Sequence, residues 1–422
     1  MELQEYNIVD ALDVLIDYRG RTPKKSAKGI PTLSAKSVKM GYIDYNQCYY
    51  ISKEEYDSFM VRGFPQKGDI LFTTEAPLGV VAKLDRDDVA VAQRLLTLRG
   101  KKGVLDNDFL LYYLQSSEGQ QRIMAKQSGS TVMGIRQEEF RKINILIPSY
   151  EEQKKIASVL SALDEKIALN KKMNKKLEAM AKRLYDYWFV QYDFPDKNGH
   201  PYKTTGGPMT YNPTLKREIP EGWEVKKVSD YADLITKGTT PSTLGFDFQD
   251  VGINFVKVEC IENGQIRQEN LMHISEEAHD AMKRSQLHGN DILVTIAGRL
   301  GSAAIVSEHI LPANTNQAVA LIRMKKEYGH LVNYIYRVIS SSSMQKRLQG
   351  SNAQSIQKNL TLPILGDIEF VQDSNCEIIK RFNEITKPIF LRQQENIQEI
   401  SRLTALRDKL LPLLMNGQVM VG

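Results

Sequence analysis

The sequence predicts an α+β protein made of two mixed α/β globules, which are joined by two long helices that form an antiparallel coiled coil. Two observations carry this prediction. The two halves of the 422-residue chain repeat the same short motifs in the same order, and each half ends in a long segment whose apolar residues recur with a spacing of three and four. Such a repeat implies a pseudo-two-fold relation between the halves.

The repeat consists of matched segments that keep a constant order. The clearest are turns that lead into apolar runs, Lys-Gly-Asp at 67–69 in the first half and Gly-Asn-Asp at 289–291 in the second. Identity between the halves is low elsewhere, so the repeated positions should be framework, and function should lie in what differs between the copies. The matched segments are 19–23 with 237–241, 41–43 with 264–266, 69–73 with 291–295, 78–79 with 300–301, Gln93 and Arg99 with Gln317 and Arg323, and Gly129, Ser130 and Ile135 with Gly350, Ser351 and Ile356.

Each half is predicted to form a mixed α/β globule of about 150 residues, a usual domain size. The apolar, β-branched runs after the turns indicate buried strands, and so do residues 89–91 and 318–322. Amphipathic patterns predict a helix over 108–124 in the first copy and over 331–348 in the second. The predicted domains are a globule over 1–149, a helix over 150–192, an extended linker over 193–221, a globule over 222–375 and a helix over 376–416.

The first long helix should begin near Ser149, because Glu151 and Glu152 suit a helix N-terminus. From Ile156 onward its seam residues keep a four-three spacing. In the second helix Pro388 should cause a kink or a short break. The seam candidates are Ile156, Leu160, Leu163, Ile167, Asn170, Asn174, Leu177, Ala181, Leu184 and Trp188 in the first helix, and Phe382, Ile385, Ile389, Asn396, Leu403, Leu406, Leu410 and Leu413 in the second.

An amphipathic helix of this length cannot bury its apolar stripe alone, and pairing the two helices is the simplest solution. The segment 193–221 is rich in Pro and Gly and long enough for the chain to return, so an antiparallel pair is expected. Asn170 and Asn174 would set its register at some cost in stability. The alternative is that each helix packs on its own globule as a core helix, but the persistent heptad spacing favours the pair.

Composition limits the function classes. A net charge of +5 and a pI near 8.8 are compatible with nucleic-acid binding without identifying it. The three cysteines, Cys48, Cys260 and Cys376, are far apart, which argues against a disulfide framework and a zinc site. No apolar run approaches the ~20 residues of a membrane span. The N-terminus has no apolar signal-peptide core, so a cytoplasmic protein is expected.

The sequence shows no catalytic constellation. It has no P-loop, HExxH, CxxC or zinc-deaminase pattern, and its histidines follow no ligand spacing. Tyr-Asn-Pro-Thr at 211–214 lacks the second proline and the aromatic residue of an amino-methyltransferase motif, so we interpret it as a linker turn. Asp69 and Glu75 are a poor nuclease pair, because Ala297 replaces Glu75 in the second copy and no lysine follows at a suitable spacing. Asp69 and Asp291 are better explained as turn residues before strands.

Several motifs resemble those of one family. Glu-Glu-Gln-Lys-Lys-Ile-Ala at 151–157 and Leu-Tyr-Asp-Tyr-Trp-Phe at 184–189 are similar to the central conserved helix of type I restriction–modification specificity subunits. Arg-Asp-Lys-Leu-Leu-Pro-Leu-Leu-Met-Asn-Gly at 407–417 resembles the end of their C-terminal helix. Ile-Pro-Glu-Gly-Trp-Glu-Val at 219–225 with Gly-Thr-Thr-Pro at 238–241 resembles the opening of their second recognition domain. The resemblance covers essentially the whole chain.

The resemblance implies a non-catalytic, DNA-binding subunit. In this family two target-recognition domains each read half of a bipartite, asymmetric DNA site, and the helices act as a spacer and as a docking surface for two methyltransferase subunits. A motor and nuclease subunit joins to give the restriction complex. S-adenosylmethionine, ATP and Mg would be bound by those partners and not by this chain. Half-sites on one DNA face lie about 34 Å apart, and a helix pair of about 57 Å, at ~1.5 Å per residue, could set such a gap.

Base-reading residues should be polar or basic side chains near loops that differ between the copies, since the half-sites differ. Each candidate could instead be ordinary solvated surface, and phosphate contacts are more common than base contacts. The candidates are Arg19, Arg21, Lys24, Lys36, Arg62, Thr74, Arg94, Ser130, Thr131 and Arg136 in the first globule, and Lys237, Thr239, Lys257, Arg299, Asn316, Gln317, Ser351, Asn352 and Gln354 in the second.

Two other functions are open at this point. One is a coiled-coil scaffold that binds protein only, and the other is a standalone enzyme. A duplicated α/β globule with divergent loops argues against the scaffold, and the missing catalytic constellations argue against the enzyme. A gel-shift series with the methyltransferase partner would separate a DNA reader from a scaffold, and a methylation assay on the isolated chain should be blank.

Overall fold

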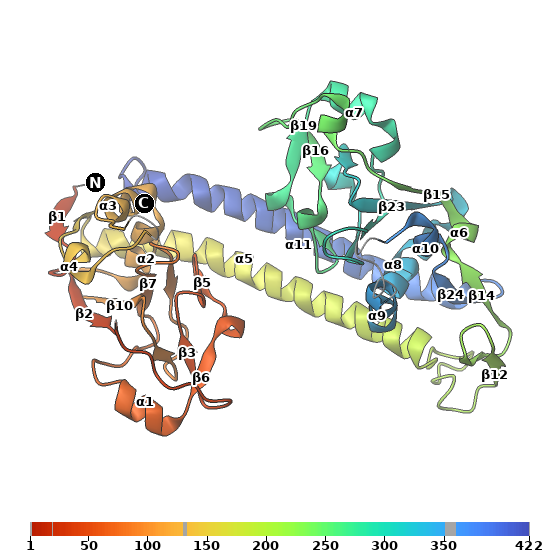
Figure 1. Ribbon diagram of the computed structural model, residues 1–422, viewed down its shortest axis with the longest axis horizontal. Coiled ribbons are helices and arrows are strands. Elements are labelled where there is room, and N and C mark those ends of the chain that lie inside the picture. The colour runs from red at the N-terminus through yellow and green to blue at the C-terminus, as the bar shows by residue number, and fades with distance from the viewer. Residues whose placement is uncertain (1, 19, 130–132, 351–359, 422) are drawn as a thin grey trace. The chain divides into compact units, whose positions relative to one another are not determined.

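The computed structural model describes residues 2–18, 20–129, 133–350 and 360–421 (Figure 1). The chain forms two compact units. The first contains Met1–Leu169 and Glu399–Gly422, and the second contains Asn170–Gln398. Each unit therefore combines one globule with a part of each of two long helices, which are α5 (Tyr150–Tyr185) and α11 (Glu377–Met415).

The first globule is built around an antiparallel sheet with the strand order β2-β10-β7-β8. Its β7 is the apolar run after the Gly68-Asp69 turn, and every side chain of this strand is buried. In a second sheet, β3 pairs with β6 antiparallel and with β9 parallel. The strands are β1 (Gln4–Asn7), which pairs with β11 (Asn144–Ile147), β2 (Leu12–Asp17), β3 (Ile30–Leu33), β4 (Val38–Lys39), which pairs with β5 (Tyr42–Ile43), β6 (Tyr49–Ile51), β7 (Ile70–Thr73), β8 (Val81–Lys83), β9 (Ala90–Val91) and β10 (Leu95–Gly100).

The second globule repeats this topology strand for strand. Its central sheet has the order β15-β23-β20-β21, and β16 pairs with β19 antiparallel and with β22 parallel. The predicted internal repeat is thereby confirmed at the level of the fold. The strands are β14 (Trp223–Lys227), which pairs with β24 (Glu369–Asp373), β15 (Ala232–Lys237), β16 (Ile253–Val256), β17 (Ile261–Glu262), which pairs with β18 (Gln265–Ile266), β19 (Met272–Ile274), β20 (Ile292–Thr295), β21 (Ala303–Ile305), β22 (Ala313–Thr315) and β23 (Val319–Met324).

The predicted single helix in each globule is two helices. The break falls at Ser116 and at Ser341, where the backbone is extended. The Ser116 hydroxyl accepts a hydrogen bond from the N–H of Gly119 at 3.1 Å, so it caps a new helix instead of continuing the old one. The helices are α1 (Lys53–Phe59), α2 (Asn107–Gln115), α3 (Ser117–Met124) and α4 (Gln137–Phe140) in the first globule, and α6 (Val228–Tyr231), α7 (Glu276–Ala281), α8 (Val332–Ser340), α9 (Ser342–Gly350) and α10 (Leu362–Gly366) in the second.

Residues 193–221, predicted to be an extended linker, are folded onto the second globule. They contain an antiparallel pair, β12 (Met209–Asn212) and β13 (Arg217–Pro220). Phe194 stacks on Trp223 with ring centroids 5.1 Å apart and belongs to the buried core of the second unit. The segment is folded because aromatic side chains among its Pro and Gly residues, such as Phe194 and Tyr202, pack into that core. The turn at Asn212 is confirmed, since its Oδ1 accepts hydrogen bonds from the two N–H groups that follow Pro213.

Helices α5 and α11 pack against each other in both units. In the second unit Asn396 Nδ2 donates to Asn174 Oδ1 at 2.7 Å, and Gln393 Nε2 donates to the carboxylate of Glu178. The two helices therefore run antiparallel there. In the first unit Arg407 pairs with Asp164 of α5. The predicted seam of α5 is confirmed, because its side chains are buried or half-buried throughout. Parts of the same helices also belong to the cores of the globules. The two expected alternatives, a helix pair and helices packed on their own globules, therefore both occur.

The predicted seam of α11 was wrong at two positions. Ile385 and Leu406 are 44 % and 43 % exposed, and the adjacent Thr386 is buried instead. The buried seam keeps a four-three spacing but includes polar residues such as Gln393. A seam chosen from apolar residues alone omits them. The helix also continues unbroken through Pro388, so the expected short break is absent from this described segment.

Candidate nucleic-acid interface

Three segments meet where strand β7 ends in the first globule. The N–H of Thr74 donates to the carbonyl of Arg94 at 3.0 Å, and the N–H of Ile135 donates to the carbonyl of Thr74 at 2.9 Å. Glu75 is bridged to Gly134 of the same segment. The residues that follow β7, precede β10 and precede α4 are therefore held together. We call this the loop end of the globule, and use the same name where β20 ends in the second.

The second globule has the same backbone framework at its loop end. The N–H of Ile296 donates to the carbonyl of Ala318 at 2.8 Å, and the N–H of Leu360 donates to that of Ile296 at 2.9 Å. By these hydrogen bonds Leu360 is the counterpart of Ile135, whereas Ile356, the match expected from the sequence, lies outside the described residues. The counterparts, first globule before second, are Thr74 and Ile296, Glu75 and Ala297, Arg94 and Ala318, and Ile135 and Leu360.

Several predicted DNA contacts lie at the loop end of the first globule. Arg94 is 52 % exposed, and its Nε lies 2.6 Å from Oε1 of Glu75. Arg136 is exposed and directly precedes α4. Lys36 is exposed and lines a hollow of about 300 Å³ beside the loop that follows β7. Thr74 is only 2 % exposed, so it supports the backbone of the loop end, and its burial does not favour a direct DNA contact.

Three more basic candidates lie beside α1, next to the end of edge strand β2. The Arg21 guanidinium lies over the Phe59 ring, 5.4 Å from its centroid. The N–H of Lys24 donates to a carboxylate of α1 at 2.9 Å. Arg62 Nη1 donates to the carbonyl of Asp17, the last residue of β2, at 2.8 Å. These contacts fix the backbone or the guanidinium of each residue beside α1.

In the second globule a comparable group gathers at the loop end. The N–H of Thr239 donates to the carbonyl of Thr315 at 3.1 Å, and the Thr240 hydroxyl donates to Oε1 of Gln317. Lys237 is exposed at the end of β15. These contacts tie the segment after β15 to the segment before β23. The candidates brought together are Lys237, Thr239, Asn316 and Gln317.

Two other candidates in the second globule have different surroundings. Arg299 is exposed on the loop between β20 and β21, and its Nη1 lies 4.0 Å from Oε1 of Glu262, the outer limit of an ion pair. Lys257 is half-buried, with Nζ 3.2 Å from Sδ of Met272, so its ammonium is turned toward its own globule. The remaining candidates lie outside the described residues: Arg19, Ser130, Thr131, Ser351, Asn352 and Gln354.

Sequence reasoning missed the ion pair that anchors the framework of each globule. Asp69 is 1 % exposed and lies 2.6 Å from Nε of Arg99; Asp291 is equally buried and lies 2.7 Å from Nη2 of Arg323. The hydrogen bond to Asp69 raises the pKa of Arg99. Each carboxylate also accepts a backbone N–H of its turn, as predicted for a turn residue. A signal was present, because aspartate and arginine recur together in both copies.

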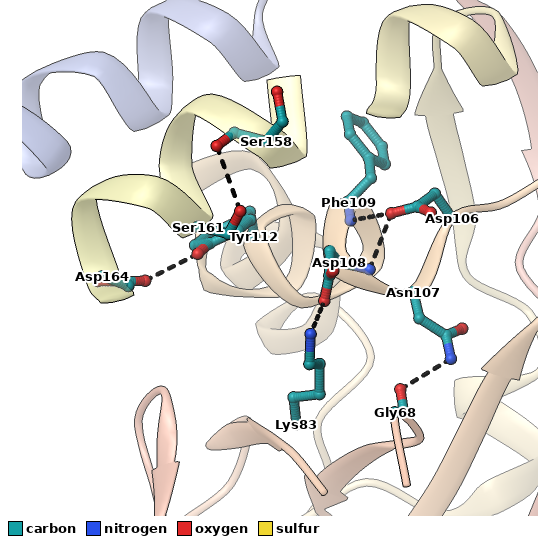
Figure 2. A network of polar contacts seen from close by, with 10 residues as sticks. All are labelled: Gly68, Lys83, Asp106, Asn107, Asp108, Phe109, Tyr112, Ser158, Ser161 and Asp164. Atoms are coloured by element: carbon teal, nitrogen blue, oxygen red, sulfur yellow. Dashed lines mark hydrogen bonds and ion pairs between the residues drawn. The ribbon is translucent and has the colours of Figure 1, made fainter. Parts of the chain in front are cut away.

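The first globule is attached to the helices by polar contacts around α2 (Figure 2). The Tyr112 hydroxyl donates to Oδ2 of Asp164 on α5 at 2.8 Å, and the same carboxylate accepts a hydrogen bond from Arg407 of α11 at 2.9 Å. Burial, together with the charge of Asp164, raises the pKa of Tyr112 far above its usual range, so the phenol stays a donor. Asp106 caps α2, and Asp108 pairs with Lys83 at 2.5 Å. One carboxylate therefore joins the globule to both helices.

The second globule is attached through a buried arginine. Arg337 of α8 is paired with Glu178 of α5, with Nη2 2.9 Å from Oε2, and its side chain is only 10 % exposed. Gln393 of α11 donates to the same carboxylate at 3.4 Å. Next to it, Asn174 and Asn396 form a buried hydrogen-bonded pair. The register role predicted for Asn174 is thus supported by a specific partner.

In the part of the chain that the structure describes, no three His, Cys, Asp or Glu side chains are grouped so that they could hold a metal ion. None of the helices in that part has the length and apolar character needed to cross a membrane.

Comparisons with known proteins agree on one family. The family profile described as "Type I restriction modification DNA specificity domain" matches residues 4–179 and 220–372, one segment for each globule. The chain is 29 % identical over 369 residues to the MjaIX specificity subunit of a type I restriction enzyme from Methanocaldococcus jannaschii, covering 86 % of this chain and 79 % of that protein. It is 24 % identical over 406 residues to the HindI specificity subunit from Haemophilus influenzae, covering 84 % and 87 %.

A solved structure supports the fold. The crystal structure of a type I restriction–modification system S subunit from M. genitalium matches with a TM-score of 0.58 at 18 % identity, covering 98 % of this chain and 96 % of that one. The family profile covers most of the chain and repeats once per globule, as the internal duplication requires. The chain therefore belongs to the type I restriction–modification specificity subunits, the non-catalytic subunits that recognise the target DNA sequence for the methyltransferase and restriction complex.

Proposed function

We propose that each globule reads one half of a bipartite, asymmetric DNA target and that the α5–α11 pair sets the gap between the halves. The observation that carries this proposal is the duplicated fold with a shared backbone framework and different side chains at the loop end. Two copies of one reading device with different contact residues suit two different half-sites. The DNA contacts are proposed to come from the exposed basic and polar residues of the two loop ends, together with Arg21, Lys24 and Arg62 beside α1.

The helices are also proposed to dock two methyltransferase subunits, which a motor and nuclease subunit joins for restriction. The apolar side chains that α5 and α11 expose would pack against such partners. S-adenosylmethionine is assigned to the methyltransferase subunits, and ATP and Mg to the motor subunit. The assembly is placed in the cytoplasm, where its DNA target lies. The exposed side chains are Leu169, Met180, Ile385, Leu391 and Leu406.

The spacer role is tested by inserting one heptad after Leu169 in α5 and a matching heptad after Gln398 in α11. Seven residues keep the seam in phase and add about 10 Å, or roughly three base pairs at ~3.4 Å each. Expressed with its methyltransferase partners, the variant should methylate the same two half-sites with a gap that is about three base pairs longer. The measurement is the methylated motif mapped across the host genome.

Insertion of one heptad in α5 alone is the matched control. It displaces the seam of α5 relative to that of α11, so it should abolish methylation. An unchanged gap in the double-insertion variant would refute the ruler. A wild-type complex that methylates without any two-part motif, or that fails to shift a duplex in a gel, would instead favour the protein-only scaffold.

A further inference from the structure

Glu75 and Arg94 form an exposed ion pair at the loop end of the first globule. Their side chains are 37 % and 52 % exposed, and Arg94 Nε lies 2.6 Å from Glu75 Oε1. Arg94 has φ of +70°, a left-handed conformation that is unfavourable for a residue with a Cβ. Its carbonyl is held by the N–H of Thr74. The backbone therefore fixes where the arginine begins, and Glu75 fixes where its guanidinium lies.

Stability does not explain this arrangement. Ion pairs as exposed as this one contribute little to folding, whereas the left-handed backbone costs about 1 kcal/mol. The second globule shows that the framework has no need of the pair. Its loop end keeps the same backbone hydrogen bonds with Ala297 in place of Glu75 and Ala318 in place of Arg94. A strained backbone conformation that the fold does not require is typical of a functional residue.

The chemistry of the pair points to one ligand. A guanidinium has five N–H donors, and a carboxylate can engage at most two of them, so at least three remain for a ligand. A guanidinium held in one orientation can donate two N–H bonds to the O6 and N7 acceptors of guanine in the major groove, and its replacement by Ala318 in the second globule suits a base contact that differs between the half-sites. We propose that Arg94 reads a guanine in the half-site of the first globule and that Glu75 is its positioning residue. This inference rests on the proposed two-half-site function.

The test uses the full chain with its methyltransferase partners and maps the methylated motif for each variant. Arg94→Ala should make one guanine position of one half-site degenerate and weaken binding to the cognate duplex by about 5- to 150-fold, the range of a bidentate arginine–guanine contact. Glu75→Gln should relax the same position less, and Glu75→Asp, which keeps the charge, should restore part of the preference. The other half-site and the gap should not change. A purely structural role for Glu75 would lower the yield of folded protein without altering base preference.

The matched control is Arg86→Ala. Arg86 also forms an exposed pair with a carboxylate, that of Asp88, but it lies beyond β8, whose end pairs with the start of β7 and not with its loop end. This variant should leave the motif intact. The inference is overturned if Arg94→Ala keeps the full motif, or if it weakens cognate and random duplexes equally, as a phosphate contact would. If the wild-type motif is not bipartite, the proposed function fails first, whatever the variants show.

Discussion

The two globules share a framework and differ in what they present at the loop end. In the first, Glu75 from the loop after β7 holds Arg94 from the segment before β10. In the second, both counterparts are alanines, and Arg299 extends from the loop after β20. The backbone hydrogen bonds below these side chains are equivalent. The two copies therefore share the platform and carry these exposed arginines on different loops.

The attachment of each globule to the helices differs in the same way. Tyr112 and Arg337 lie one turn before the equivalent helix breaks at Ser116 and Ser341, so they occupy the same place on α2 and α8. The tyrosine is a neutral donor to a carboxylate that is 33 % exposed, whereas the arginine, itself 10 % exposed, forms an ion pair with a carboxylate that is 30 % exposed. The platform is constant, but the chemistry of its attachment is not. This contrast can be tested unit by unit, because both tryptophans, Trp188 and Trp223, lie in the second unit.

The largest loss of stability is expected from the buried Asp–Arg ion pair, which both globules share. Arg99→Leu and Arg323→Leu each leave a carboxylate that is 1 % exposed without its partner, which should destabilise the affected unit by about 3 kcal/mol. Only Arg323→Leu should move the urea transition seen by tryptophan fluorescence. Arg99→Leu should instead raise amide hydrogen exchange in the first globule.

The double variant Asp291→Leu with Arg323→Leu is the control, since removing both charges should recover part of the loss. If Arg99→Leu shifted the tryptophan signal as much as Arg323→Leu, the two platforms would not be energetically separate.

A smaller and unequal effect is expected at the helix attachments. Arg337→Met leaves the Glu178 carboxylate without its cationic partner, which should cost about 2 kcal/mol, while Tyr112→Phe leaves Asp164 with Arg407 and should cost about 1 kcal/mol. Local hydrogen exchange in α8 and in α2 measures the two costs. Equal losses would remove the contrast between the attachments.

The smallest effect concerns pH, and it should appear in one unit only. All six histidines lie in the second unit. Burial lowers the pKa of His309, and burial and Lys380 lower that of His330. A lowered folded pKa means that the unfolded chain binds more protons, so stability is present above about pH 6.5 and is lost as pH falls below it. The tryptophan-detected midpoint should therefore fall between pH 7 and 5.5, and His309→Gln with His330→Gln should reduce that slope. An unchanged slope would assign the pH dependence to other groups.

Local patterns were enough to predict the framework. The repeated turns located β7 and β20, and the four-three spacing located the seam of α5, including Asn174. Each of these features is written in neighbouring residues, where periodicity and turn chemistry act directly. The seam of α11 was partly mistaken because Gln393 is buried only by virtue of its partners on α5.

The sequence by itself determined the duplication, the fold class, the two long helices and the family. Only the tertiary structure decided which side chains meet: Asp69 with Arg99, Arg337 with Glu178, and Glu75 with Arg94. The sequence alone does not indicate the role of Glu75, because its partner Arg94 lies on another segment. Pairings of this kind depend on the three-dimensional approach of distant segments, which no local periodicity encodes.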